Sequence, residues 1–392
     1  MLMDQLENAV PPSAEQPLDA EKILSNIQAL RPFLQARGSE IEELRRIPDD
    51  ILDAIRQTGA FRMMTPRSWG GAEMNPMQLN EALEELAMGN AAAAWCVMIQ
   101  TDSGQYSGLL DQSVARQIYS DPDMTTSNVI RAAGRAQKVD GGYLVNGRWP
   151  FASGCLHTDW FAGGCHIFDG VRVVLDEQGQ PLHKMIIARR EDFIIHDTWY
   201  TTGLRGTGSN DIEAKNLFIP EERMFGFDKQ SHEGALYLWP SILCAKMPGV
   251  VLGIARSAIE AATESMRSKK VKSEFVALAI ADAQTLYASA RAYVHQSLEV
   301  AWKRLETGNL PNEQERVGVF LARANAFQAS RAAVQLVFDA VGGPAVYGKK
   351  TPLERHLRDL TTACQHTFGQ RKAQIAAGEL MLGSLEKPFL FL

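Results

Sequence analysis

The sequence has few of the residues that build disulfide frameworks or metal sites. It contains five cysteines, an odd number, and no two of them form a C-x-x-C pair. We therefore expect reduced, mostly buried thiols, as in a cytoplasmic protein. The eight histidines include no H-x-x-x-H or H-E-x-x-H spacing, so the sequence predicts no metal site.

Long basic and long apolar runs are also missing. The formal net charge is -6, and the only cluster of positive charge is Lys269–Lys272, which argues against nucleic acid as a partner. The segment Met1–Glu15 carries acidic residues and no apolar stretch, so we expect no signal peptide there. No stretch approaches the roughly 18 apolar residues of a membrane helix, so we expect no membrane partner.

The composition is that of a globular protein with a large core. The chain has 392 residues, of which 45% are hydrophobic and 22% charged. Helical periodicity runs from residue 18 to about residue 110 and returns from Gly234 to Leu385. Between them, from Thr125 to Phe225, the pattern changes to period two, which predicts a compact antiparallel β domain.

The period-two region contains several plausible strands separated by turns. Asp140–Gly142 and Asp176–Gln180 have the composition of hairpin turns. The expected strands are Val129–Ile130, Leu144–Trp149, Trp160–Ile167, Val171–Leu175, Lys184–Ala188, Phe193–Ile195 and Ile212–Ile219. In the last region, the long amphipathic stretches Pro248–Met266, Glu274–Glu306, Asn312–Ala340 and Leu353–Leu382 predict a four-helix bundle.

The stretch Gly147–Trp160 is the strongest candidate for a ligand site. Trp149, Phe151 and Ser153 share a parity on the expected strand, so one face would carry two aromatic rings and a hydroxyl. A flat redox ring can rest on such a face, with the hydroxyl bonded to the ring edge. The alternative is that both aromatics fill a β core and Ser153 caps a bend.

Two further stretches carry polar groups in unusual places. Asn90–Ile99 is apolar all round, so it should be a buried helix that delivers Gln100 and Asp102 at its end, either to a pocket wall or to solvent. Gly203–Ile212 holds a G-x-G without a following helix, so it is not a dinucleotide motif. Its hydroxyls and amides either hold a phosphate or ring edge, or the segment is a glycine-rich turn.

Several motifs resemble the acyl-CoA dehydrogenase superfamily. These are Leu204–Ile212 followed by Leu217–Glu221, the run Gly342–Tyr347, and the pair Arg358 and Asp359. The resemblance implies an α+β fold with an N-terminal α-helical domain (18-122), a middle antiparallel β domain (123-228) and a C-terminal four-helix bundle (229-392). It also implies a homotetramer.

Dehydrogenases of this superfamily need a carboxylate base, and this chain lacks one at the expected place. The segment Thr361–Lys372, which follows the Arg-Asp pair, contains no Asp or Glu, and neither does Tyr237–Ser257. The chain instead resembles the two-component flavin monooxygenases of the same fold in Trp149–Gly154, in Gly206–Asn210 and in a histidine, His366, in the region of the glutamate. The resemblance implies an oxygenase that receives reduced FMN or FAD from a separate NAD(P)H-dependent reductase and reacts it with dioxygen.

Roles for individual residues follow from this resemblance. Ser153 would accept a hydrogen bond from the central-ring nitrogen of the flavin and protect its hydroperoxide, and His366, with an unperturbed pKa near 6.5, would be the neutral or basic group beside the substrate. Both are the expected catalytic residues. The expected cofactor-binding residues are Ser127, Trp149, Phe151, Ser153, Thr207, Gly208, Ser209, Lys269 and Lys270. The expected substrate-binding residues are Trp95, Gln100, Asp102, His366 and Gln370.

The substrate implied is a small aromatic or heteroaromatic molecule. Related aromatic hydroxylases carry a histidine where this chain has Gln100–Asp102, which favours an indole-like ring N–H as much as a phenol. Two alternatives remain at this point. One is a flavin-dependent acyl-CoA dehydrogenase or nitroalkane-type oxidase with a non-standard base, and the other is a helical scaffold that has lost its flavin.

Overall fold

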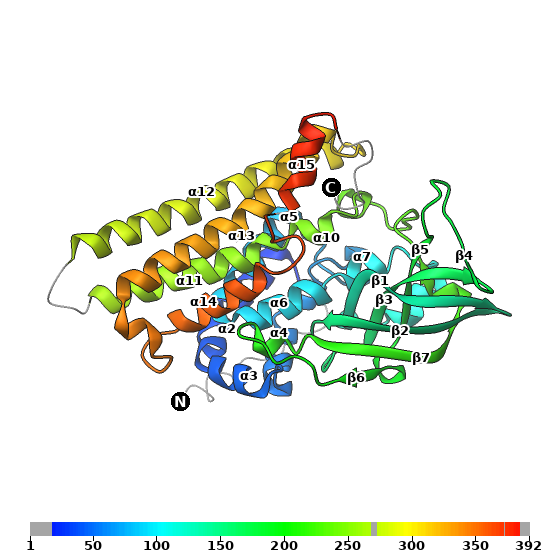
Figure 1. Ribbon diagram of the computed structural model, residues 1–392, viewed down its shortest axis with the longest axis horizontal. Helices are drawn as coiled ribbons and strands as arrows, with labels where there is room; N and C mark the ends of the chain where they lie inside the picture. The colour runs from blue at the N-terminus through cyan, green and yellow to red at the C-terminus, as the bar shows by residue number, and fades with distance from the viewer. Residues whose placement is uncertain (1–17, 268–272, 372, 385–392) are drawn as a thin grey trace.

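The computed structural model describes residues 18–267, 273–371 and 373–384. Long helices run side by side at one end of the molecule and a twisted sheet forms the other end, with α4 and α6 between them (Figure 1). Lys269 and Lys270 lie outside the described residues, so their expected role in cofactor binding stays a prediction.

The three longest helices of the first region begin at residues whose side chains cap them, Asp19, Asn75 and Asn90. Asn75 and Gln78 form a capping box before Pro76, and Asn90 accepts a hydrogen bond from the amide of Ala93. The α-helices here are α2 (Ala20–Ala36), α3 (Gly38–Leu44), α4 (Asp49–Gln57), α5 (Pro76–Gly89), α6 (Ala91–Gln100), α7 (Ser103–Tyr106) and α8 (Gln112–Ile118), with 3-10 turns η1 (Ala60–Arg62) and η2 (Arg67–Trp69).

The middle region is one sheet in the order β6-β7-β2-β1-β3-β5-β8, with β4 paired to β3. The expected hairpin at Asp140–Gly142 is confirmed: Val139 pairs with Gly142, and Gly141 has φ +73°. The strands are β1 (Thr126–Val139), β2 (Gly142–Ala152), β3 (Trp160–Asp169), β4 (Arg172–Val173), β5 (His183–Arg189), β6 (Ile194–His196), β7 (Asn210–Pro220) and β8 (Met224–Phe225), with 3-10 turns η3 (Arg190–Asp192), η4 (Arg205–Thr207) and η5 (Glu221–Arg223).

The sheet is not purely antiparallel. β1 pairs in parallel with β3, while β2, β5 and the remaining neighbours pair antiparallel. The parallel pair follows from the route of the chain, because β2 returns along β1 and the segment 153–159 then brings β3 to the other edge of β1. The expected antiparallel pairing holds for every strand pair of the described residues except β1 with β3, which the period-two pattern does not predict.

The last region contains the long bundle helices, and the fourth of them is broken. Leu353–Leu382 is two helices rather than one, because residues 364–371 form turns that contain His366 and Gly369. The helices are α9 (Ala235–Leu238), α10 (Ile242–Ala245), α11 (Pro248–Arg267), α12 (Glu274–Leu305), α13 (Glu313–Val341), α14 (Leu353–Ala363) and α15 (Ala373–Met381), with the 3-10 turn η6 (Gly343–Val346) before α14.

The two helical regions share one hydrophobic core. Buried side chains of α2, α5 and α6 belong to the same cluster as those of α11, α12 and α13, while the sheet encloses a second cluster around Trp149 and Phe161. The stretch Ile242–Arg267 is long and apolar enough to cross a membrane by length and composition, with a mean hydropathy of 1.5, but 94% of its 18-residue window is buried inside the protein. This stretch, which comprises α10 and α11, is therefore packed within the core.

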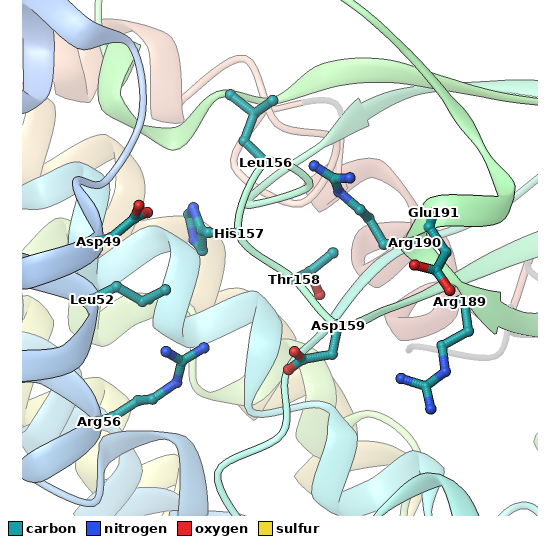
Figure 2. Close-up of a pocket in the computed structure, with 10 residues that line it drawn as sticks. All are labelled: Asp49, Leu52, Arg56, Leu156, His157, Thr158, Asp159, Arg189, Arg190 and Glu191. Carbon is teal, nitrogen blue, oxygen red and sulfur yellow. The ribbon is translucent and has the colours of Figure 1, made fainter.

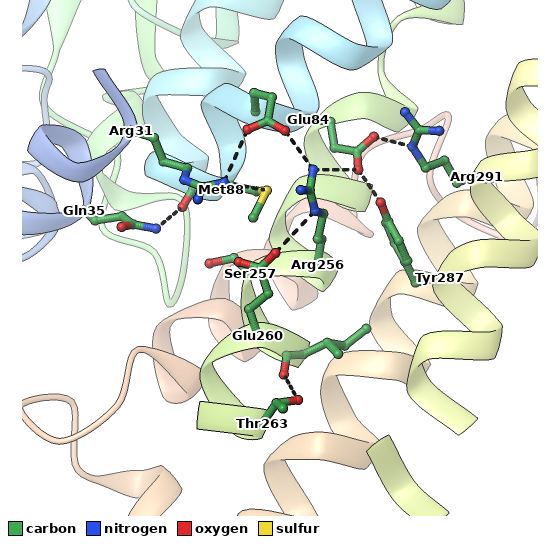
Figure 3. A network of polar contacts seen from close by, with 12 residues as sticks. Arg31, Gln35, Glu84, Met88, Arg256, Ser257, Glu260, Thr263, Tyr287 and Arg291 are labelled. Atoms are coloured by element: carbon green, nitrogen blue, oxygen red, sulfur yellow. Dashed lines mark hydrogen bonds and ion pairs between the residues drawn. The ribbon is translucent and has the colours of Figure 1, made fainter. Parts of the chain in front are cut away.

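A buried ion network fastens the first region to the bundle (Figure 3). Glu84 of α5 is 2% exposed and accepts hydrogen bonds from Tyr287 and from Arg291 of α12. Its neighbour Glu85 accepts a 2.7 Å bond from Arg256 of α11. Because these carboxylates lie in the core, the arginines compensate charges that would otherwise be costly to bury.

Candidate active site

A chain of buried hydroxyls lies where the sheet meets α6. The Oγ atoms of Ser153 and Ser209 are 2.7 Å apart, and Ser209 Oγ is 2.7 Å from Thr207 Oγ1. Thr207 Oγ1 donates to the carbonyl oxygen of Leu204 at 2.8 Å, and Trp95 Nε1 of α6 donates to Ser153 Oγ at 3.2 Å. Each of the three hydroxyls is at most 5% exposed.

The two ends of this chain fix the direction of every hydrogen bond in it. An indole N–H can only donate and a carbonyl oxygen can only accept. The protons therefore point from Trp95 through Ser153, Ser209 and Thr207 to Leu204. Ser153 Oγ donates its proton to Ser209 and accepts the Trp95 N–H with one lone pair. Its second lone pair is therefore free to accept another N–H. Ser127 supports this arrangement, since its hydroxyl donates to the Ser153 carbonyl oxygen at 2.8 Å.

Local backbone geometry brings the hydroxyls together. β2 ends at Ala152, and Gly154, with φ +76°, donates its amide to the carbonyl oxygen of Thr207 at 2.9 Å. Leu204 and Gly208 have φ +50°, so the loop around η4 curls back on itself. The glycine-rich segment is thus both a tight turn and the source of two of the three hydroxyls.

The expected face of two aromatics and a hydroxyl is not formed, and this prediction is wrong. Trp149 is fully buried in the sheet core, where its indole donates to the Gly164 carbonyl oxygen at 2.8 Å and packs against Phe161. The register of β2 against β7 shifts between Trp149 and Ala152, and Phe151 has φ +67°. This irregularity breaks the alternation, so Phe151 is 68% exposed while Trp149 points inward.

Phe151, unlike Trp149, therefore has a ring that is open to solvent. Its ring meets Trp199 edge-on at 6.1 Å between centroids. A left-handed backbone at a non-glycine residue is strained, and an exposed phenylalanine gains no burial energy, so neither feature serves the fold by itself.

His366 also contacts Trp95. The two rings are 5.7 Å apart between centroids in a T-shaped arrangement, and Nδ1 of His366 accepts a 3.3 Å hydrogen bond from the Phe368 amide. Burial, together with the charge of Arg323, lowers the pKa of His366 to about 4. The expectation of an ordinary pKa near 6.5 is therefore corrected: His366 is neutral at pH 7, with its proton on Nε2.

Two of the expected substrate ligands are engaged elsewhere. Asp102 forms a buried ion pair with Lys246, and its other oxygen accepts from Asn128 at 3.0 Å. Gln370 donates to the Gln365 carbonyl oxygen within its own loop. Both side chains therefore already have partners within the protein, and the assignment of Asp102 and Gln370 to the substrate stays a prediction.

Gln100 is different, because both its amide atoms are buried without a hydrogen-bond partner among the described residues. It lies against Gly154, where an added Cβ would come within 2.9 Å of Gln100 Nε2 and 3.2 Å of His157 Nε2. A cavity of about 390 Å³ opens between α4 and the segment 156–159 (Figure 2). His157, Arg56 and Arg190 are among the residues that line it, and Gln100 is not. His157 was not among the sequence candidates.

Comparisons with known proteins agree with this arrangement of the chain. Family models for the acyl-CoA dehydrogenase N-terminal and C-terminal domains match residues 27–111 and 246–371. The flavin-dependent monooxygenase, oxygenase subunit HsaA, of Rhodococcus jostii (strain RHA1) is 30% identical over 86% of this chain and 91% of its own length. The chain belongs to the flavin-dependent monooxygenases of the acyl-CoA dehydrogenase family.

More distant members of the family show the same extent of similarity. Indole-3-acetate monooxygenase of Pseudomonas putida is 26% identical over 90% of this chain and 92% of its own length. The crystal structure of the HsaA monooxygenase from M. tuberculosis has a TM-score of 0.88 and 26% identity, and it covers 95% of this chain and all of that chain. The monooxygenase therefore has the fold that the sequence motifs imply.

The monooxygenase also holds two buried ionisable residues that were not among the expected site residues. One is Asp359, which anchors the Leu204 amide at 2.6 Å and whose pKa burial raises to about 6. The other is Arg323 of α13. It occurs three residues after Phe320 and four before Phe327, on the apolar face of the helix, and that spacing is the signal that marks a buried arginine.

Proposed function

We propose that this monooxygenase is an oxygenase component that uses reduced flavin and dioxygen to hydroxylate a small aromatic or heteroaromatic molecule. The observation that carries the proposal is the free lone pair of Ser153 Oγ at the head of the directed hydroxyl chain. Reduced flavin, when bound, supplies the electrons that activate dioxygen for transfer of one oxygen atom to the substrate.

The residues present fit a flavin on three counts. Ser153 offers an acceptor for a ring N–H, Phe151 offers an exposed ring, and Gln100 offers an amide whose donor and acceptor have no other partner among the described residues. We propose that Ser153 and Phe151 hold the flavin ring, and that Ser127, Thr207, Gly208 and Ser209 shape the loop beneath it.

His366 and Trp95 supply the substrate side of the proposal. The neutral imidazole keeps Nε2–H as a donor, because Nδ1 already accepts from the Phe368 amide. Trp95 contacts both Ser153 and His366, so we propose that the substrate ring lies beside this indole, in reach of the flavin and of the imidazole donor. The buried surroundings of Ser153 exclude water, which keeps the N–H that it binds from being lost to solvent.

Dehydrogenation of acyl thioesters is not favoured by this geometry. A proton acceptor for that reaction must be a free carboxylate beside the ring. Asp102 is paired with Lys246, and Asp359 holds the Leu204 amide, so both nearby buried carboxylates are occupied.

We further propose a separate NAD(P)H-dependent flavin reductase, a homotetramer and a cytoplasmic location. The printed name of the R. jostii relative, an oxygenase subunit, supports a separate component. Exposed apolar side chains on one helix, α12, support self-assembly; they are Phe275, Leu278, Tyr293 and Val300. Five free, buried cysteines are consistent with a reducing compartment.

The test is a reconstitution with an added flavin reductase, NADH and a panel of aromatic compounds, indoles first. Oxygenated product that requires both reductase and dioxygen supports the proposal. Reduction of a flavin on the protein by an acyl-CoA would contradict it, and so would a protein with no affinity for flavin in either redox state.

A further inference from the structure

Arg323 is a buried cation. On one edge of its guanidinium, Nε and Nη2 have no hydrogen-bond partner among the described residues. Its side chain is 2% exposed, and the guanidinium lies over the rings of Phe320 and Phe368, with centroid distances of 4.5 and 4.6 Å. Both of these nitrogen atoms are buried. None of the ion pairs formed between described residues includes Arg323. The other arginines with a buried orphan nitrogen, Arg205, Arg316 and Arg355, have only one such atom each.

This arrangement is costly for the protein alone. A buried charge without a partner carries a desolvation penalty, because it loses its hydrogen bonds to water and nothing replaces them. The flanking aromatic rings attract the cation through their faces but leave the N–H groups in the guanidinium plane unsatisfied. A group with two in-plane acceptors would remove that penalty.

The unpaired atoms define which ligand group fits. Nε–H and Nη2–H lie side by side and point the same way, which is the fork that binds both oxygens of a carboxylate. The position points to the substrate, because Arg323 is close enough to influence the pKa of His366, and Phe368 contacts both residues.

We propose that Arg323 binds an anionic group of the substrate, a carboxylate, and so selects aromatic acids over their neutral analogues. The inference rests on the proposed function, since it assigns a substrate class to the same site. Arg323 is positioned to bind the acidic end of the molecule while the aromatic ring lies toward Trp95 and Ser153.

The test compares acids with their isosteric amides on flavin-free protein. Indole-3-acetate and indole-3-acetamide, and phenylacetate and phenylacetamide, are titrated by calorimetry at pH 7.5. We expect each acid to bind at least about tenfold more tightly than its amide, as a charge-assisted bidentate contact implies. Arg323→Met should abolish that preference and Arg323→Lys should keep part of it. Arg331→Met, on the exposed side of the same helix, is the matched control and should keep the full preference.

A second measurement needs no ligand. Replacing an uncompensated buried charge by an apolar side chain of similar length should leave Tm unchanged or raise it, whereas a guanidinium with a structural partner would lower Tm when replaced. Equal binding of acid and amide, no binding of either acid, or a clear fall in Tm for Arg323→Met would overturn the proposal. If the acids bind as expected but no product forms with reductase and dioxygen, the proposed function fails and the anion site stands.

Discussion

At the scale of single residues, the proposed function depends on which side chains donate and accept the protons of the site. Ser153 is the residue whose free lone pair we assign to a flavin N–H, and its removal should expose that proton to loss. We expect Ser153→Ala to divert a several-fold larger share of consumed dioxygen to hydrogen peroxide. The measurement is hydrogen peroxide released per NADH oxidised in the reductase-coupled reaction.

The same substitution leaves the Trp95 N–H and the Ser209 hydroxyl without their partner, so we expect a loss of about 1–2 kcal/mol in the free energy of unfolding. Ser330→Ala is the control. Ser330 is fully buried on α13 and its hydroxyl has no partner among the described residues, so this variant should keep both its stability and its peroxide share. An unchanged peroxide share in Ser153→Ala would contradict the role of Ser153.

His366 gives a pH dependence whose sign can be worked out. Its pKa in the folded protein is about 4, below the ordinary 6.5, so between these values the unfolded chain binds more protons than the folded one. The contribution to stability is therefore fully present above about pH 6.5 and is lost as pH falls toward 4.

We expect His366→Gln to flatten this part of the stability profile, measured as the urea midpoint from pH 4 to pH 7. Product yield of the wild type should be level above about pH 5.5, and that of His366→Gln should be low at every pH. A wild-type yield with a midpoint near pH 6.5 would show that the imidazole titrates freely, against the lowered pKa. The charge of Arg323 contributes to that lowering, so Arg323→Met should move the His366 titration upward in an NMR experiment.

At the scale of elements, the loop around η4 is fixed by its contact with α14. Gly203 packs so closely that an added Cβ would lie 2.1 Å from the Arg358 carbonyl oxygen. We expect Gly203→Ala to push the loop away from α14, break the bond from the Leu204 amide to Asp359, and displace Thr207 and Ser209. The expected results are a loss of about 1–3 kcal/mol in stability and weaker binding of reduced flavin.

Thermal unfolding and a flavin titration under anaerobic conditions measure these two effects. Gly343→Ala is the matched control, since no heavy atom lies within 4 Å of its added Cβ. If Gly203→Ala bound reduced flavin as tightly as the control, the loop would not belong to the flavin site.

The sequence predicts the elements better than it predicts their irregularities. Period two identifies the strands, and the Gly-Gly pair locates the hairpin at Gly141, because both are local properties. The inward turn of Trp149 and the exposure of Phe151 accompany a register shift against β7. The last helix breaks at residues 364–371, where Cys364 and Gly369 form hydrogen bonds with α13. Neither is encoded in a local pattern, so parity and periodicity alone misplace them.

The candidate site likewise combines residues that the sequence predicts with contacts that only the three-dimensional packing creates. The hydroxyls of Ser153, Thr207 and Ser209 come from motifs that are visible in the sequence, and the structure brings them together. Asp102 pairs with Lys246, which lies 144 positions further along the chain, and no sequence pattern near Asp102 predicts this ion pair. The unpaired edge of Arg323 is likewise a property of three-dimensional packing.

At the scale of the whole molecule, the two helical regions form one core, so they should unfold together. The ion network of Glu84 crosses this boundary and joins α5 to α12 (Figure 3). Removing its charge would leave Arg291 facing a neutral amide and would weaken the bond from Tyr287. We expect Glu84→Gln to lower the free energy of unfolding by about 3 kcal/mol, as is typical when a buried ion pair loses one partner.

Urea unfolding followed by far-ultraviolet circular dichroism and by tryptophan fluorescence tests both expectations. The two signals should change in a single coincident transition, shifted to lower urea in Glu84→Gln. Glu264→Gln is the control, because Glu264 is 78% exposed in its side chain and lies 3.9 Å from Arg267, a surface pair that contributes less than about 1 kcal/mol. Separate transitions for the two signals would show that the helical regions are independent units, and an unshifted midpoint in Glu84→Gln would show that the network does not stabilise their contact.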